Sequence, residues 1–153
     1  MAAGLWNMPI EKKPQRAWQR MLSGRRLDLL DPSPLDIEIE DIAHGLARIP
    51  CWNGQTIGAY PFSVAQHSLL VCDLVDYLSV QPLKSAQLTT LLHDAPEYVI
   101  SDLITPFKKA IGQGYKTIEH RLSRAIFLRF GLPAAAPEIL QRLIKQADRL
   151  VPH

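Results

Sequence analysis

The pair His93-Asp94 follows an apolar run and stands one helical turn before Glu97. His67 lies upstream and Asp148 downstream, each on the apolar side of a segment with helical spacing. Two imidazoles and two carboxylates can bind a divalent cation. Nitrogen and oxygen ligands without a thiolate favour Mn, Fe, Co, Ni or Zn over Mg. The sequence therefore predicts one divalent metal ion bound by His67, His93, Asp94 and Asp148.

Each of these side chains also has a simpler interpretation when it is taken alone. A histidine on an apolar helix face is more often hydrogen-bonded in the core than bound to a metal. An inward aspartate, such as Asp148, can pair with an arginine. Burying four such groups without a counterion is costly, however, and a divalent cation removes that cost. The combination therefore favours a metal site over a structural cluster.

Polar residues after the second histidine are candidates for catalysis and substrate binding. Glu97 lies four residues after His93. It either orients or deprotonates a metal-bound water, or is an ordinary charge at a helix end. Asp102, Thr105 and Lys108 follow in a predicted loop. They either offer polar groups to a sugar and a cation to a phosphate, or are ordinary residues of a proline-terminated loop.

The remaining histidines are weaker candidates for ligands. His44 and His120 are expected on solvated surfaces, and His153 is the last residue of the sequence. Because none of them forms a further cluster with acidic residues, the sequence does not predict a second metal ion.

Four segments have the spacing of apolar residues that is typical of amphipathic helices. They span residues 63–78, 85–98, 115–130 and 137–151. Ser63 and Gln66 form a capping box at the start of the first segment. Pro96 is expected to bend or end the second, which frees backbone near the predicted metal site.

The chain before these helices has weaker signals. We expect a short helix over residues 18–22, another that begins near Leu35 or Asp41, and a loop over residues 50–61, which are rich in proline and glycine. Apart from a brief alternation at residues 37–39, no pattern is typical of a strand. The sequence therefore predicts an all-α fold.

Composition limits the other possibilities. The 153 residues suffice for one domain with its own core, on which residues 1–35 are expected to pack as an extension. No stretch is apolar enough for a membrane span, and the N-terminus lacks a signal-peptide pattern. Two cysteines are too few for a disulfide framework, so we expect a cytoplasmic, reduced protein. A net charge of +2 predicts neither a nucleic-acid nor a membrane partner.

Several motifs resemble those of the HD-domain metal-dependent phosphohydrolases, and more closely their bacterial YfbR-type 5'-deoxynucleotidase branch. The order H…HD…D of the predicted ligands is the general feature. The more specific motifs are Val64-Ala65-Gln66-His67-Ser68-Leu69, His93-Asp94-Ala95-Pro96-Glu97, Asp102-Leu103, Thr105-Pro106, Lys108, Tyr115-Lys116, Ile118-Glu119 and Lys145-Gln146-Ala147-Asp148. The resemblance covers residues 42–151, which is most of the chain.

This resemblance implies a helical HD-domain bundle with one divalent ion at the four predicted ligands. Glu97 would act on the attacking water and Asp102 would contact the sugar. The substrate would be a nucleoside monophosphate or a similar small phosphate ester, with Trp52, Thr105 and Lys108 as further expected contacts. A homodimer is compatible with this reading.

The chain departs from the family pattern at two places. Relatives carry a phosphate-binding arginine just before the aromatic residue of the loop ahead of the first histidine, whereas this chain has Cys51 before Trp52. Arg48 is the nearest substitute and is a candidate phosphate ligand. The sequence also stops five residues after Asp148, where relatives continue into a further helix. Part of a pocket wall or dimer surface is therefore expected to be missing or supplied by another subunit.

The leading hypothesis from the sequence is a mononuclear metal phosphomonoesterase. A phosphodiesterase or triphosphohydrolase of the same fold is the nearest alternative among enzymes. Cys51 favours a metal- or nucleotide-binding module without turnover, while Glu97 and Asp102 argue against it. A helical scaffold without any metal is the simplest alternative.

Overall fold

The computed structural model describes residues 17–80 and 83–151. Within them lie β1 (Trp18–Arg20), β2 (Arg26–Asp28), α1 (Ile39–Leu46), α2 (Val64–Leu78), α3 (Lys84–Leu91), α4 (Glu97–Ile100), α5 (Thr105–Ile111), α6 (Gln113–Arg129) and α7 (Glu138–Asp148). Two short 3₁₀ helices, η1 (Pro34–Asp36) and η2 (Cys51–Gly54), precede α1 and α2. This mostly helical content confirms the predicted all-α class. His153 and the first sixteen residues lie outside the described part of the chain.

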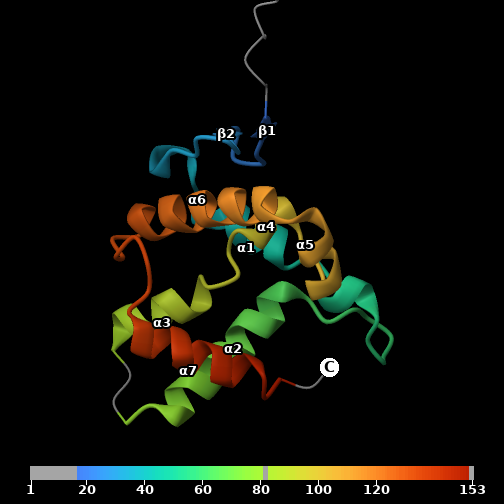
Figure 1. Cartoon of the computed structure of the whole chain (residues 1–153), viewed down its shortest axis with the longest axis vertical. Coiled ribbons are helices and arrows are strands. Elements are labelled where there is room, and N and C mark those ends of the chain that lie inside the picture. The colour runs from blue at the N-terminus through green and yellow to red at the C-terminus, as the bar shows by residue number, and fades with distance from the viewer. Residues whose placement is uncertain (1–16, 81–82, 152–153) are drawn as a thin grey trace, which may run out of the picture.

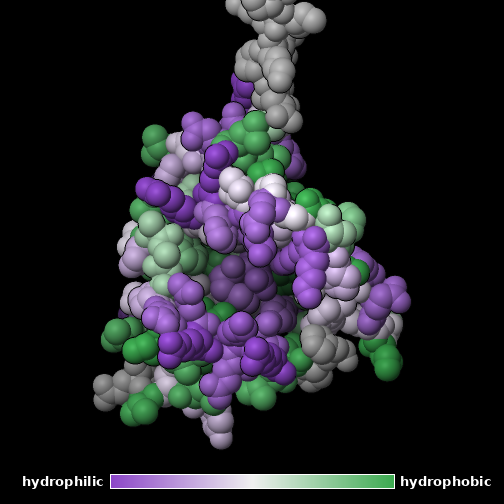
Figure 2. All heavy atoms as spheres, in the orientation of Figure 1, coloured by the Kyte–Doolittle hydropathy of each residue, from purple (hydrophilic) through white to green (hydrophobic). Residues whose placement is uncertain are grey.

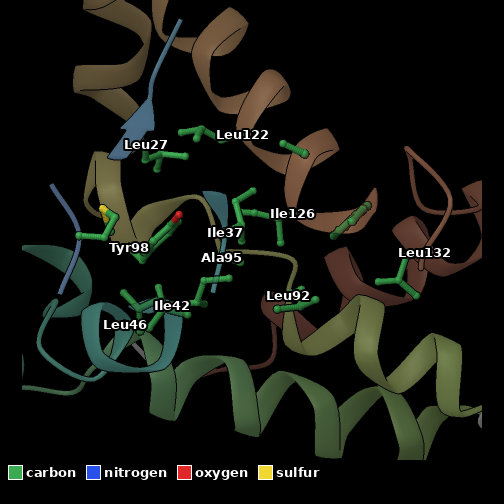
Figure 3. Packing of buried hydrophobic residues seen from close by; sticks show 14 of the residues in the cluster. Leu27, Ile37, Ile42, Leu46, Leu92, Ala95, Tyr98, Leu122, Ile126 and Leu132 are labelled. Atoms are coloured by element: carbon green, nitrogen blue, oxygen red, sulfur yellow. The ribbon is translucent and has the colours of Figure 1, made fainter. Parts of the chain in front are cut away.

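The helices form two packed groups. Figure 1 shows α6 crossing the molecule below the hairpin, near α1 and α4, while α2, α3 and α7 form the lower part. One buried apolar cluster joins the hairpin, α1, α4 and α6 (Figure 3), and a second joins α2 and α7. Among the described residues, no helix combines the length and apolar character that crossing a membrane requires.

The first predicted helix is confirmed as α2. The Ser63 hydroxyl accepts a hydrogen bond from the Gln66 backbone N–H at 3.2 Å, and the Gln66 side chain accepts one from the Ser63 N–H at 2.9 Å. This capping box supplies partners for backbone donors that the first turn cannot pair. Val71 and Val75 are fully buried in the cluster with α7. His67 lies one turn before Val71, so the same packing turns its imidazole inward.

The prediction of one helix over residues 85–98 is wrong in its second half. The helix α3 ends at Leu91, and successive turns lead to α4, which begins at Glu97 after Pro96. The Ala95 N–H donates to the Leu92 carbonyl at 3.1 Å, as expected for tight turns rather than a continuous α-helix. Proline has no N–H and its ring crowds the preceding turn, which explains the break. His93 and Asp94 therefore lie in a turn between two helices.

The N-terminal part of the described chain forms a hairpin, so the predicted helix over residues 18–22 is wrong. β1 and β2 pair antiparallel with Gln19 opposite Leu27, and Gly24 takes a φ of 88° in the turn between them. Glycine adopts this left-handed conformation without steric cost. Met21 and Leu27 are buried in the first cluster, and Leu22 is exposed. The alternation at residues 37–39 does not form a strand, because α1 begins at Ile39.

Two loops of the sequence prediction also contain helical structure. Residues 50–61 include the short η2, and the loop expected over residues 102–108 turns into α5 at Thr105, with Pro106 in its first turn. The helices predicted over residues 115–130 and 137–151 are confirmed as α6 and α7, with ends shifted by a few residues. The α6 helix is followed by Gly131 with a φ of 70°, a common helix ending.

The position of α4 is set by a close approach to α1. A Cβ atom built at Gly45 would lie 2.9 Å from the Tyr98 Cβ and 3.1 Å from the Tyr98 carbonyl oxygen. Any residue other than glycine would therefore push α4 away. Because Tyr98 follows Glu97, this contact also fixes the start of α4, where the candidate catalytic carboxylate lies.

Candidate metal centre

The four predicted ligands converge although they come from three separate parts of the chain. His67 Nε2 lies 3.0 Å from Asp148 Oδ1 and 3.5 Å from Asp94 Oδ2, and His93 Nε2 lies 3.0 Å from the same Asp94 oxygen. Single ligand atoms of His67, His93 and Asp148 all lie within 4.8 Å of one another. The α2 helix supplies the first histidine, the turn before α4 supplies the HD pair, and α7 supplies Asp148 at its last residue.

The hydrogen bonds at the histidines fit a cation. His93 Nδ1 lies 2.7 Å from the Thr90 carbonyl oxygen, which can only accept, so Nδ1 carries the proton. In the neutral ring, Nε2 then presents a lone pair toward an Asp94 oxygen that also carries lone pairs. Two acceptors this close require a proton or a cation. A histidine whose outer nitrogen is bonded to a carbonyl is a common arrangement in metal sites.

Burial and charge at the pair agree with this description. Burial by itself lowers the pKa of His93, but the adjacent Asp94 carboxylate raises it, and the net pKa is above the ordinary histidine value. Burial also raises the pKa of Asp94, while the neighbouring His93 lowers it, so that the net pKa lies below the ordinary value. The site therefore favours positive charge next to an ionised carboxylate.

Glu97 is buried next to the four ligands. Its pKa is raised to about 9, first by burial and then by the carboxylates of Asp94 and Asp102. Lys108 opposes this shift, since its Nζ lies 3.9 Å from Glu97 Oε1. A carboxyl group that holds a proton near neutral pH is suited to proton transfer.

Lys108 is itself held from the α6 side. Its Nζ lies 3.9 Å from Glu119 Oε1 and 5.4 Å from the centre of the Tyr115 ring. The Tyr115 hydroxyl donates a hydrogen bond to Glu119 at 3.1 Å. Sequence reasoning found Tyr115 and Glu119 only as parts of a family motif. The structure gives them a role in placing the lysine next to Glu97.

Asp102 fixes an unusual loop at the edge of the site. Its Oδ2 accepts a hydrogen bond from the Trp52 backbone N–H at 2.8 Å. Trp52 and Asn53 have φ values of 52° and 55°, in the left-handed region that costs non-glycine residues of order 1–3 kcal/mol each. The Trp52 ring stacks on Phe62 and meets the His67 ring edge-on at a centroid distance of 6.2 Å. This loop therefore supports a predicted metal ligand.

Cys51, which stands where the resemblance predicts an arginine, and Arg48, the candidate substitute, lie in different places. Cys51 is buried and lines the cavity beside the four ligands. Burial, followed by the Asp102 and Glu97 carboxylates, raises the pKa of its thiol to about 12, so it stays protonated and is a poor nucleophile. Arg48 is exposed, donates to the His44 carbonyl oxygen at 3.1 Å, and is not part of the cavity wall. The structure thus does not bring Arg48 together with the other predicted substrate residues.

A cavity of about 1000 Å³ opens in front of the predicted ligands. Figure 2 shows the hollow at the centre of this face, surrounded by hydrophilic side chains, between α6 and α7 as Figure 1 orients them. Trp52, Asp102, Thr105 and Lys108, the other predicted substrate residues, line it. It is also lined by three basic side chains that sequence reasoning missed: His120, Arg124 and Lys145.

A sequence signal for these residues exists in hindsight. His120 and Arg124 are spaced by one turn on α6, and Lys145 lies one turn before Asp148 on α7. Spacing of three or four residues places each pair on one face of its own helix. The sequence does not show that these faces of α6 and α7 border the same cavity. His120 is exposed, as expected, but its side chain borders the cavity.

Comparison with known proteins places the chain in a family without assigning an activity. No family model matches it. Over 134 residues, which are 88% of this chain and 68% of the relative, it is 61% identical to an uncharacterized protein of Rhodobacter capsulatus. A solved structure of a conserved hypothetical protein from Pyrococcus furiosus aligns with 74% of this chain and 78% of its own, at a TM-score of 0.55 and 26% identity. By its identity and coverage, this chain belongs to the same family as the Rhodobacter capsulatus protein.

Proposed function

We propose that this protein is a metal-dependent phosphohydrolase that cleaves the phosphomonoester of a nucleoside 5'-monophosphate, with deoxyribonucleotides as the expected substrates. One observation carries the proposal. Two histidines and two aspartates, His67, His93, Asp94 and Asp148, converge in the lining of a large cavity beside the buried carboxyl of Glu97.

The same four residues would hold a divalent ion, since they offer only nitrogen and oxygen atoms and one His93 nitrogen faces a carboxylate as a second acceptor. When bound, such an ion supplies Lewis-acid activation of water and neutralises charge on phosphoryl oxygens. Mn, Fe, Co, Ni and Zn suit this ligand set better than Mg.

Glu97 supplies the proton transfer in this proposal. It takes a proton from the water that attacks phosphorus, and it can return that proton to the leaving oxygen. Lys108, at 3.9 Å from Glu97, favours the ionised form of the carboxylate that accepts the proton. A positive charge at the four ligands acts in the same direction, because it opposes the carboxylates that raise the Glu97 pKa.

The cavity wall supplies the substrate contacts. Lys108 offers an ammonium group to a phosphoryl oxygen, and Asp102 and Thr105 offer polar groups to a sugar. Asp102 already binds the Trp52 N–H with one oxygen, so its other oxygen is the one available to a sugar hydroxyl. The Trp52 ring is packed on Phe62, which makes that wall rigid.

Phosphate release measured across a panel of nucleotides, with added Mn, Co, Mg or Zn, tests this proposal. We expect metal-dependent release from nucleoside 5'-monophosphates, and loss of release in Glu97→Gln. Glu138→Gln is the matched control, because Glu138 is exposed on α7, pairs with Arg142 and lies outside the cavity. No metal-dependent release from any nucleotide would refute the proposal.

One observation favours a second candidate, a nucleotide-binding module without turnover. The cavity wall contains Cys51 where relatives are expected to carry a phosphate-binding arginine, and Arg48 lies elsewhere. A thiol cannot replace a bidentate guanidinium. Metal-dependent nucleotide binding by calorimetry, with no phosphate release from mono-, di- or triphosphates, would favour this candidate. Release only from diesters or triphosphates would instead favour the phosphodiesterase or triphosphohydrolase alternative.

A further inference from the structure

Two cations on the cavity wall are not used by the proposed chemistry. Arg124 projects from α6 and Lys145 from α7, on the two helices that flank the hollow in Figure 2. Both residues are exposed, whereas His67 is only 6% exposed. The two cations therefore lie nearer the mouth of the cavity than the two histidines do, while Asp148, one turn after Lys145 on α7, is itself half-exposed.

Three arginines of the same helices have partners within the protein, whereas Lys116 of α6, which lies outside the cavity, has none among the described residues. Arg121 donates to the Leu30 carbonyl oxygen at 2.7 Å, Arg129 pairs with Glu38 at 3.2 Å, and Arg142 pairs with Glu138. Within residues 17–80 and 83–151, Arg124 and Lys145 have no ion pair or hydrogen bond. Their charges are thus available to a ligand at the cavity mouth.

Arg124 and Lys145 also change the net charge of the cavity lining in favour of an organic phosphate. Asp94, Glu97, Asp102 and Asp148 line it, against the single ammonium of Lys108. With a divalent ion and neutral histidines, these groups sum to zero when Glu97 is protonated and to one net negative charge when it is ionised. Arg124 and Lys145 make the sum net positive in either protonation state of Glu97. A cavity of one charge sign attracts ligands of the opposite sign.

We propose that Arg124 and Lys145 form an anion subsite that binds a second phosphate group of the substrate, away from the phosphate that is cleaved. The substrate class is then an organic bisphosphate whose leaving group carries its own phosphate. Water adds to the phosphorus beside the predicted ligands, Glu97 takes a proton from that water, and the P–O bond breaks as the leaving oxygen receives the proton. Inorganic phosphate and a monophosphorylated alcohol are the products. This inference rests on the proposed phosphohydrolase function for its reaction, but its binding step can be tested without turnover.

The cavity has room for such a ligand. Its volume of about 1000 Å³ is at the upper end of the roughly 300–1,000 Å³ typical of small-molecule sites. Arg124 also borders a second hollow of about 490 Å³, which Arg121 lines and Lys145 does not. An anion bound in that second hollow would depend on Arg121, and this dependence separates the two sites.

Calorimetric titration of the Mn-loaded Glu97→Gln protein tests the subsite. The ligands are 2'-deoxyadenosine 5'-monophosphate, 2'-deoxyadenosine 3',5'-bisphosphate and fructose 1,6-bisphosphate. The substitutions Arg124→Gln and Lys145→Gln are introduced separately into the Glu97→Gln protein. Each is expected to raise the Kd of a bisphosphate about tenfold, as for the loss of a charge-assisted hydrogen bond, and to change the Kd of the monophosphate by less than about twofold.

Two control variants and the choice of ligand separate the outcomes. Arg121→Gln reports on the second hollow, and Lys109→Gln removes an exposed lysine of α5 outside the cavity. Neither should change any Kd. If Arg124→Gln and Lys145→Gln lower the affinity for the nucleoside bisphosphate selectively, the substrate is a nucleotide. If they lower the affinity for the sugar bisphosphate selectively, the substrate is a sugar phosphate. Equal losses for mono- and bisphosphates, no loss, or a loss in Arg121→Gln would overturn the subsite.

The wild-type, Mn-loaded protein distinguishes failure of the subsite from failure of the proposed function. Selective binding without phosphate release from any ligand would reject the phosphohydrolase function and leave the subsite in place. Release from monophosphates and bisphosphates with equal kcat/KM, unchanged in Arg124→Gln, would keep the function and reject the subsite.

Discussion

Two buried polar clusters of this protein differ in how well their groups are paired. Asp41, at the start of α1, is 5% exposed and accepts hydrogen bonds from the Ser23 N–H at 2.9 Å and the Ser23 hydroxyl at 2.6 Å. Beside the cavity, His67 Nδ1 and His93 Nε2 are buried without a hydrogen-bond partner among the described residues. The Asp41 carboxylate is paired by the protein itself, whereas His93 Nε2 faces the Asp94 carboxylate and would be paired by a cation bound there.

The difference separates a structural role from a functional one. Buried polar atoms in folded proteins almost always have partners, because an unpaired one costs about 1–3 kcal/mol. Asp41 meets this requirement while it ties the hairpin turn to α1. The histidines do not: Asp94 lies 3.0 Å from the unpaired His93 Nε2, and Asp148 lies 3.0 Å from His67 at Nε2 rather than at its unpaired Nδ1. A protein tolerates such a cost where the groups are kept for a ligand.

Removing a ligand from the histidine–aspartate cluster is expected to have the largest effect. Asp94→Ala should abolish metal uptake, and with it the stabilisation that bound metal adds, about 2.7 kcal/mol when free metal is 100 times its Kd. Elemental analysis measures the metal uptake, and thermal unfolding with and without metal measures the stabilisation. Asp73→Ala, at an exposed position of α2, is the control. An unchanged metal stoichiometry in Asp94→Ala would contradict the site.

A change at Glu97 should separate catalysis from metal binding. Glu97→Gln is expected to retain the metal and to lower kcat by about 10²–10⁴-fold, the usual effect of a lost general acid or base. Steady-state phosphate release and metal analysis on one preparation provide the comparison. Loss of metal together with activity would make Glu97 a ligand or a support of the site, and unchanged kcat would remove it from the mechanism.

The Asp41 cluster should behave in the opposite way. Asp41→Ala is expected to lower the free energy of unfolding by about 2 kcal/mol, because a buried carboxylate loses two hydrogen bonds, and to leave metal stoichiometry unchanged. Denaturant unfolding measures the loss. Asp28 also accepts two backbone hydrogen bonds but is exposed, so Asp28→Ala should cost clearly less. Reduced metal uptake in Asp41→Ala would show that the two clusters are not independent.

The last expected effect is a pH dependence of the stability of the metal-free protein. The pKa of Glu97 rises from 4.5 to about 9 on folding, so the folded state binds more protons than the unfolded state between these values. Its contribution to stability is complete below pH 4.5 and is lost as the pH rises toward 9, by at most about 1.4 kcal/mol per pH unit. The unfolding free energy of Glu97→Gln should fall less steeply over this window, and parallel curves would contradict the raised pKa.

Local features of the fold followed from the sequence. The apolar spacing of α2, α6 and α7 and the Ser63–Gln66 capping box are short-range patterns, and all appear in the structure. Pro96 predicted a break in the second helix but not its position at Leu91, and the hairpin and the start of α5 at Thr105 were missed. These features depend on a turn glycine, on the steric demands of proline and on the burial of Leu27 against α6. The same residues also fit a helical spacing, so local patterns could not decide between a helix and another structure.

The sequence by itself determined the chemistry of the four predicted ligands and of Glu97, because residue type fixes which atoms can bind a cation or carry a proton. Only the tertiary structure decided which side chains share the cavity. It leaves Arg48 outside, brings Arg124 and Lys145 to the mouth, and places Lys108 between Glu97 and Glu119. The reason is that spacing along a chain defines the face of one helix, while a cavity forms between helices whose relative positions depend on contacts far apart in sequence.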